Sequence, residues 1–98
     1  MHAIVNHLSF KAPIEDTLIQ KVEQDLKPKV LALPGLHGFY LVQTAEDKAF
    51  IVLLYESLSA LEEGTRTIGS PWFESNVGPY LSAPPQRSVG KVVVAASK

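Results

Sequence analysis

The chain has 98 residues, 46% of them hydrophobic and 19% charged, which is the composition of one globular domain and not of a disordered chain. Nine Lys and Arg residues against ten Asp and Glu residues give a net charge of −1. This balance argues against a broad nucleic-acid surface, which needs clustered positive charge. Cysteine is absent, so disulfides, thiolate metal sites and cysteine nucleophiles are excluded. We therefore expect a single domain over residues 1–98.

No stretch of the sequence has the character of a targeting or membrane segment. The N-terminus lacks a basic region followed by a long apolar run. The longest apolar run, residues 49–55, is far shorter than the roughly 20 residues that a membrane-spanning helix needs. We expect a cytoplasmic protein without membrane contact.

The first third of the chain predicts a strand followed by a long helix. Residues 2–10 are rich in β-branched side chains and alternate with a period of two, which predicts a strand. Residues 14–33 repeat apolar side chains about every four positions, which predicts one amphipathic helix. Pro28 is expected to kink this helix or to close its first part early, and Pro34 with Gly35 is expected to end it.

The rest of the chain predicts a hairpin, a second helical region and a last strand. Two alternating segments, 36–44 and 49–56, are joined by a short polar turn, as in an antiparallel hairpin. Ser59 followed by Glu62 resembles a capping box that opens a helix, with Ser57 as the alternative cap. The Gly-Ser-Pro segment 69–71 predicts a break and a restart of the helix. Residues 88–96 predict the last strand.

The order strand, helix, strand, strand, helix, strand is typical of one fold class. It predicts an α+β fold of the ferredoxin-like βαββαβ type, with a four-stranded antiparallel sheet and the helices on one face. The uncovered face of such a sheet is expected to be polar, because it meets water.

The sheet is nevertheless apolar on both faces. In the third strand Phe50, Val52 and Leu54 point one way and Ile51, Leu53 and Tyr55 the other, and the hairpin partner and the last strand repeat the pattern. An apolar face of this extent indicates a partner surface, and a two-fold homodimer is the simplest arrangement because one patch then complements itself. The alternative is a set of scattered exposed apolar residues on edge strands, which needs no partner.

The segment 33–40, Leu-Pro-Gly-Leu-His-Gly-Phe-Tyr, carries a family resemblance. A helix closed by Pro-Gly and a G-x-x-G that enters a strand with aromatic residues resembles the antibiotic biosynthesis monooxygenase (ABM) family of dimeric α+β barrels. The resemblance extends over nearly the whole chain in element order. It implies a site between the sheet and the helices of each subunit. The activities that it implies include cofactor-free oxygenation of aromatic polyketides and quinols, and haem degradation.

The resemblance does not extend to the haem-degrading branch. That branch places an Asn on the first strand, and a Trp and an axial His on the second helical region. Asn6 matches the Asn by its position, but the histidine position falls on Val77 and the tryptophan position on Thr67. Trp72 lies nearby in a different register. We therefore expect neither haem nor any other cofactor.

Two residues are candidates for catalysis. Asn6 interrupts an otherwise apolar strand face, where an amide could hold a substrate carbonyl or phenolate; the alternative is an amide bonded to neighbouring backbone. His37 lies beside the G-x-x-G, where it could act as a base near neutral pH; the alternative is a surface or interface histidine. His2 and His7 face opposite sides of one strand, and although His37 could approach His7, nothing supplies a third ligand, so no metal site is expected.

Three aromatic residues are candidates for binding substrate. Trp72, Phe73 and Tyr55 could line the walls of a pocket for a planar ligand, although Trp72 could equally be a core residue.

The sequence, with the family resemblance, predicts a cofactor-independent ABM-type monooxygenase acting on a small aromatic or quinol-like substrate. One alternative is a non-catalytic dimeric protein that binds a small apolar or aromatic molecule. The other is an isomerase or dehydratase on the same scaffold, which needs a firmer acid–base pair than the sequence offers.

Overall fold

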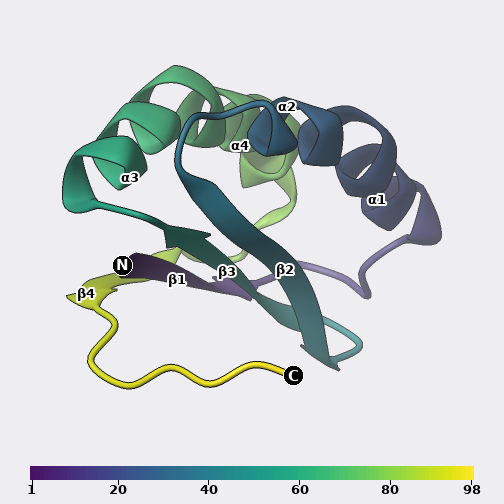
Figure 1. Ribbon diagram of the computed structural model, residues 1–98. Helices are drawn as coiled ribbons and strands as arrows, with labels where there is room; N and C mark the ends of the chain where they lie inside the picture. Colours follow the sequence, from purple (N-terminus) through teal and green to yellow (C-terminus); the bar gives the residue numbers. More distant parts are fainter.

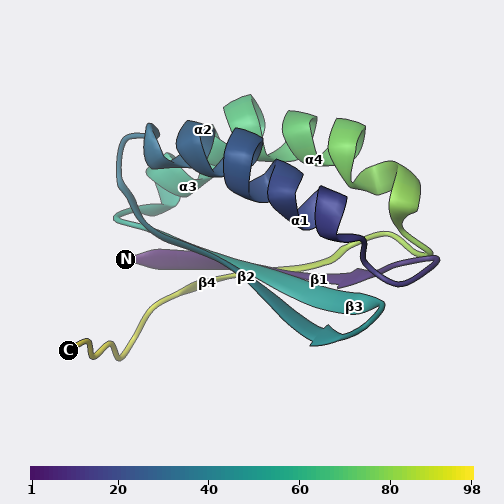
Figure 2. The same cartoon turned by 90° about the vertical axis from the view of Figure 1, so that its right-hand side faces the viewer.

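The computed structural model describes residues 1–98 as one antiparallel sheet covered on one face by a single layer of two helical regions (Figure 1). The strands are β1 (His2–Ser9), β2 (Leu36–Ala45), β3 (Lys48–Tyr55) and β4 (Gln86–Lys91), in the order β2-β3-β1-β4. The predicted ferredoxin-like α+β fold is confirmed. Figure 2 shows that all the helices lie on the same side of the sheet. No helix has the length and apolar character that a bilayer span requires.

The first helical region continues through its proline. It consists of α1 (Asp16–Lys21), the π-helical turn η1 (Val22–Leu26) and α2 (Lys27–Leu31). Of the two outcomes predicted for Pro28, a kink or an early end, the early end is wrong. The Lys27 N–H donates to the Val22 carbonyl, five residues back. This bond widens the turn just before the proline, so the missing N–H and the proline ring are accommodated without ending the helix.

The second helical region also has a π-helical turn directly before its proline. It runs through α3 (Leu58–Gly64), the π-helical turn η2 (Thr65–Gly69) and α4 (Ser70–Asn76), followed by a short 3-10 turn, η3 (Gly78–Tyr80). The Ser70 N–H donates to the Thr65 carbonyl directly before Pro71, so the predicted break at 69–71 is wrong. The helix is capped by Ser57, whose hydroxyl oxygen accepts from the Ala60 N–H at 3.1 Å, and not by Ser59.

The last strand is displaced from its predicted position. β4 starts at Gln86 and ends at Lys91, where Lys91 pairs with His2 at the beginning of β1. Only Met1 precedes His2, and its carbonyl accepts a hydrogen bond from the Val92 N–H. The apolar residues after Val92 are therefore not part of the sheet, and Val93 and Val94 are 84% and 87% exposed.

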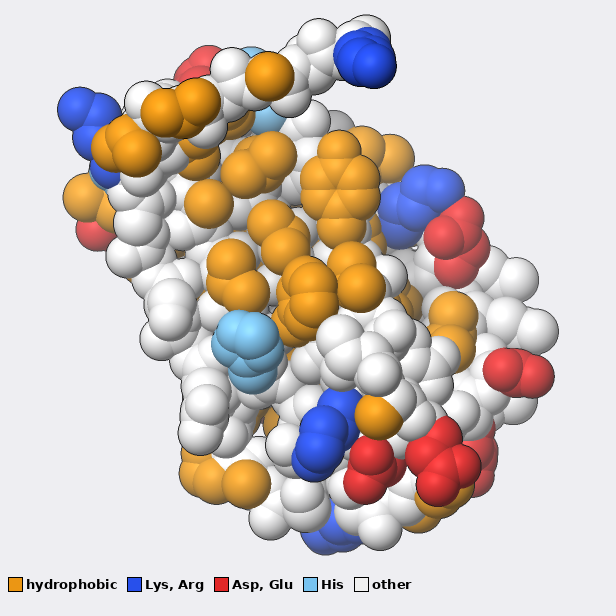
Figure 3. All heavy atoms as spheres, turned by 90° about the horizontal axis from the view of Figure 1, so that it is seen from below, with side chains coloured by type: hydrophobic (Ala, Val, Ile, Leu, Met, Phe, Trp, Pro, Cys, Tyr) orange, Lys and Arg blue, Asp and Glu red, His pale blue; other side chains and the backbone are white.

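The predicted hairpin is confirmed, and with it the two apolar faces of the central strands. β2 and β3 are joined by the two-residue turn 46–47. The helix-covered face and the helices enclose the main core cluster, which is Leu8, Phe10, Val22, Leu26, Val30, Ala49, Ile51, Trp72, Val77 and Leu81. The opposite face, which we call the open face, carries Ala3, Val5, Tyr40, Val42, Phe50, Val52 and Leu54. Figure 3 shows a continuous apolar area on this side of the molecule, with charged side chains around it.

Candidate functional site

A cavity of about 260 Å³, which we call the main cavity, lies between the sheet and the helices. Its floor consists of apolar side chains from three strands: Ile4, Phe39, Ile51 and Leu53. Both wide helical turns border it, since Leu26 belongs to η1 and Thr65 and Gly69 belong to η2. Turns of this kind recur at functional sites, and here they form part of the roof over an apolar floor.

Two polar side chains stand next to one another at the side of this cavity nearest β4. Asn6 and Arg87 are cross-strand partners of β1 and β4, so both project to the helix-covered face. Neither side chain takes part in any side-chain hydrogen bond of the chain. The structure therefore gives no support to the alternative in which the Asn6 amide is bonded to neighbouring backbone. The amide is half-buried and available to a ligand.

The charges around the main cavity are few. Arg87 is the one cationic side chain in its lining and Glu74 the one carboxylate, and they form no ion pair with each other. Thr65 and Ser70 add hydroxyl groups from the helical wall. An anionic oxygen of a ligand would find a guanidinium and an amide side by side, which is a favourable arrangement for holding a phenolate.

Tyr55 closes the cavity near the end of β3. The residue is only 2% exposed, and burial raises the pKa of its phenol above the ordinary value of 10.0, so the hydroxyl is neutral and can donate a hydrogen bond. Its ring lies against Gly64 of α3, where an added Cβ would come within 2.7 Å of the phenol oxygen. A glycine at this position is therefore what allows Tyr55 to reach the cavity wall.

Of the five residues singled out in the sequence, three meet at the main cavity. Asn6, Tyr55 and Phe73 line it, whereas Trp72 and His37 do not. His37 is exposed at the start of β2. His7 lies on β1 beside Phe50, at the other end of the sheet and separated from β2 by β3, so the prediction that His37 approaches His7 is wrong.

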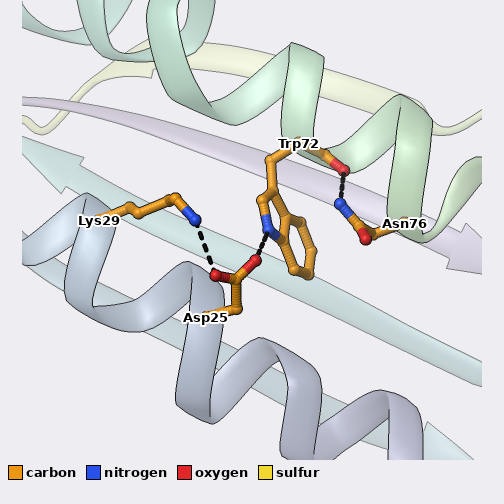
Figure 4. A network of polar contacts seen from close by, with 4 residues as sticks. All are labelled: Asp25, Lys29, Trp72 and Asn76. Atoms are coloured by element: carbon orange, nitrogen blue, oxygen red, sulfur yellow. Dashed lines mark hydrogen bonds and ion pairs between the residues drawn. The ribbon is translucent and has the colours of Figure 1, made fainter.

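Trp72 joins the two helical regions (Figure 4). Its indole N–H donates to the carboxylate of Asp25 in η1 at 2.5 Å, and Lys29 donates to the other oxygen at 2.7 Å. The Trp72 carbonyl accepts from the Asn76 side chain at 2.8 Å. Hydrogen bonds from Lys29 and then from Trp72 hold the pKa of Asp25 below its ordinary value of 3.8. The buried indole thus links the two helical regions through a hydrogen bond.

The positions that matter for metals or haem hold no suitable ligands. No group of three or more His, Cys, Asp or Glu side chains is placed to hold a metal ion. Val77, on which the sequence resemblance places the axial histidine position of the haem-degrading branch, is a buried core residue with no ligating atom. The residues present do not fit a haem held in that way.

Sequence reasoning missed Arg87 and Glu74. Arg87 falls outside a last strand that starts at residue 88, and only the actual start at Gln86 places it opposite Asn6. Glu74 is an exposed helix residue like Glu62 and Glu63, and nothing in its local sequence distinguishes it from them.

No protein-family model and no curated protein sequence matches the chain. Solved structures do share its fold. A protein of Caulobacter crescentus CB15 that is provisionally named an antibiotic biosynthesis monooxygenase is 25% identical, over 95% of this chain and 90% of its own, with a TM-score of 0.77. A monooxygenase from the gene ActVA-Orf6 of Streptomyces coelicolor, solved with the ligand nanaomycin D, is 15% identical over 99% and 91%, with a TM-score of 0.78. SnoaB of Streptomyces nogalater, described as a cofactor-independent oxygenase, is 8% identical over 99% and 97%, with a TM-score of 0.76.

Proposed function

On the premise that the chain is ABM-like in fold, we propose that it is a cofactor-independent monooxygenase of a small aromatic or quinol-like molecule. One observation carries the proposal: the unpaired side chains of Asn6 and Arg87 adjoin each other in a cavity whose floor is apolar. The fold is shared with a neighbour described as a cofactor-independent oxygenase and with another solved with a small-molecule ligand, which supports the same reading.

The chemistry needs little from the protein beyond binding and orientation. Arg87 and Asn6 would stabilise the substrate as an oxyanion, and Glu74 is the one carboxylate in the lining that could take the proton. The anion then reacts with O2 at the ring carbon that has lost the proton, forming a C–O bond, and the proton returns to give a hydroperoxide. The O–O bond breaks as the second hydrogen of that carbon leaves with the outer oxygen as water. One oxygen atom remains as a carbonyl and the other leaves as water, so the substrate carbon supplies all the electrons. The apolar floor gives the substrate ring a surface from which water is displaced when the substrate binds.

The test is oxygen consumption with anthrone, a three-ring ketone whose activated CH2 group can become a carbonyl. We expect chelator-treated protein to consume O2 and to incorporate one atom of labelled oxygen in the product. Asn6→Ala should lower kcat/KM by at least about tenfold, the cost of one lost hydrogen bond to a charged transition state. Gln20→Ala, an exposed amide on α1, is the matched control and should keep full activity.

The outcomes separate the alternatives. Full oxygen consumption by Asn6→Ala would remove Asn6 from the mechanism. Saturable binding of anthrone without oxygen consumption would favour a non-catalytic binding protein. Conversion of a substrate without oxygen consumption would favour an isomerase or dehydratase.

We also propose that the molecule is a homodimer joined through the open face. Seven apolar side chains gather on one sheet face, as is typical of a partner surface, and a two-fold axis would bury both copies of the face at once. Tyr40 and Val42, which are 56% and 39% exposed in the single chain, would then become buried.

A further inference from the structure

A second cavity, the apolar annex, adjoins the main cavity. It measures about 250 Å³, close to the volume of the main cavity, and it lies towards β2 and beneath α1. Two residues line both cavities: Ile51 in the floor and Phe73 from α4. Phe73 is half-buried and packs at the edge of the core cluster, so its ring is the partition between two chambers of similar size.

The two chambers differ in chemistry. Eleven of the twelve residues that line the annex are hydrophobic, and the exception is Gln43 on the edge strand β2, where it is exposed. The annex therefore offers no charge and no buried hydrogen-bonding group. It can favour ligand binding only by burying apolar surface of the ligand. The main cavity, by contrast, holds all the charged and hydroxyl groups of the site.

One row of side chains crosses the sheet from the polar chamber to the apolar one. The strand register places these residues side by side on the helix-covered face in the order Arg87, Asn6, Ile51, Leu41. With strands about 4.8 Å apart, this row spans roughly 14 Å. A flat molecule lying along it would have its oxygen atoms at β1 and β4 and its apolar end above β2.

We infer that the substrate is an elongated amphiphile whose oxygenated ring occupies the main cavity and whose apolar extension occupies the annex. Phe73 is the residue that decides whether the extension is admitted. This inference rests on the proposed function for the oxygenated end, but the annex itself can be tested by binding alone. A ligand that ends at Phe73 would use only about half of the combined volume of the two cavities.

The experiment compares two probes by calorimetry. The short probe is lawsone, a two-ring hydroxyquinone that is an anion at neutral pH, and the long probe is its homologue with a hexyl chain on the quinone ring. We expect the wild-type protein to bind the long probe at least tenfold more tightly, because each buried methylene strengthens binding. Leu41→Trp, which fills the annex from β2, should bring the ratio of the two Kd values close to one. Phe73→Ala, which removes the partition, should increase the ratio.

Controls keep the result interpretable. Leu31→Trp makes the same change on an exposed residue of α2 and should leave the ratio as in the wild type. If circular dichroism shows that Leu41→Trp is unfolded, Ile19→Trp at the half-buried margin of the annex replaces it.

Each other outcome overturns the inference. Equal affinities in the wild type, or a preference that survives filling the annex, would remove the annex while leaving the main cavity and the proposed function in place. Failure of both probes to bind would count against the oxyanion site itself, and the inference would fall with it.

Discussion

The contact between Tyr55 and Gly64 makes the cavity wall depend on a single missing methyl group. An added Cβ at Gly64 would lie 2.7 Å from the phenol oxygen, 3.0 Å from a ring carbon of Tyr55 and 3.1 Å from a methyl group of Leu33. Gly64 has helical backbone angles, so alanine would otherwise suit the position and even favour the helix. Sterics and helix propensity therefore act in opposite directions at this residue.

We expect the steric effect to win. Gly64→Ala should lower the free energy of unfolding by about 1–3 kcal/mol, because the added methyl group must displace the Tyr55 ring and the Leu33 methyl group from a buried contact. Gly69→Ala is the matched control, since its Cβ would meet only a backbone oxygen at 3.7 Å and should be neutral or stabilising by up to about 1 kcal/mol. Urea unfolding measures the free energy of unfolding of both variants. Equal stabilities of the two variants would show that Tyr55 moves aside without cost.

Single residues also show which parts of the site can be predicted from the sequence. Asn6 can be identified from the sequence because an amide stands out on an apolar strand face and a period of two fixes its neighbours. Arg87 cannot, because its role depends on where β4 begins. The role of Trp72 is equally hidden, since its partner Asp25 lies 47 residues away in the chain. Sequence periodicity gives the direction of a side chain but not its distant partner.

At the level of elements, Asp25 and Trp72 fasten the two helical regions together above the sheet. Asp25 belongs to η1, and Trp72 follows η2, so the link lies close to both wide turns (Figure 4). Lys29 and Trp72 both donate to the carboxylate and hold the pKa of Asp25 below its ordinary value. The link is therefore strongest when Asp25 is ionised.

This link predicts an acid-sensitive contribution to stability. Because the folded pKa of Asp25 is lowered, the contribution is complete above the unfolded value near 3.8 and is lost as the pH falls through the folded value. Asp25→Asn should thus lose less stability than the wild type between about pH 5 and about pH 2. Urea unfolding followed by circular dichroism measures the difference. Glu63, whose pKa is lowered by Arg66, titrates in both proteins, so its contribution cancels in the difference between their stabilities. Parallel profiles of stability against pH for the two proteins would contradict the prediction.

The same elements show why helix breaks are hard to predict from local sequence. A proline inside a helical pattern ordinarily predicts a kink or an end. Both helical regions instead place a five-residue turn directly before the proline, at Lys27 before Pro28 and at Ser70 before Pro71. Such a turn has no sequence signature of its own, because the packing of the helix against the sheet stabilises it. Element order was predictable from periodicity, whereas these local details depend on tertiary contacts.

On the scale of the whole molecule, the open face is a surface that the isolated chain leaves without cover. Its centre is the row formed by Val5, Val52 and Tyr40, which the strand register places side by side. Val93 and Val94 add further apolar surface just beyond the end of β4, on a tail that extends away from the sheet in Figure 2. Burying this surface against a second copy would remove it from water at both copies at once.

The proposed dimer predicts a specific response to charge. Wild-type protein should elute with twice the mass of the chain in light-scattering chromatography at micromolar concentration, and Val52→Glu should elute as a folded monomer. The reason is that a carboxylate from each copy, at the centre of the open face, would have to be buried without a partner, at a cost of several kcal/mol. Leu31→Glu is the matched control, because Leu31 is 64% exposed on α2, away from the sheet, and its variant should remain dimeric. A wild-type protein that is monomeric at every concentration would contradict the dimer, and the open face would then be an apolar surface for a different partner.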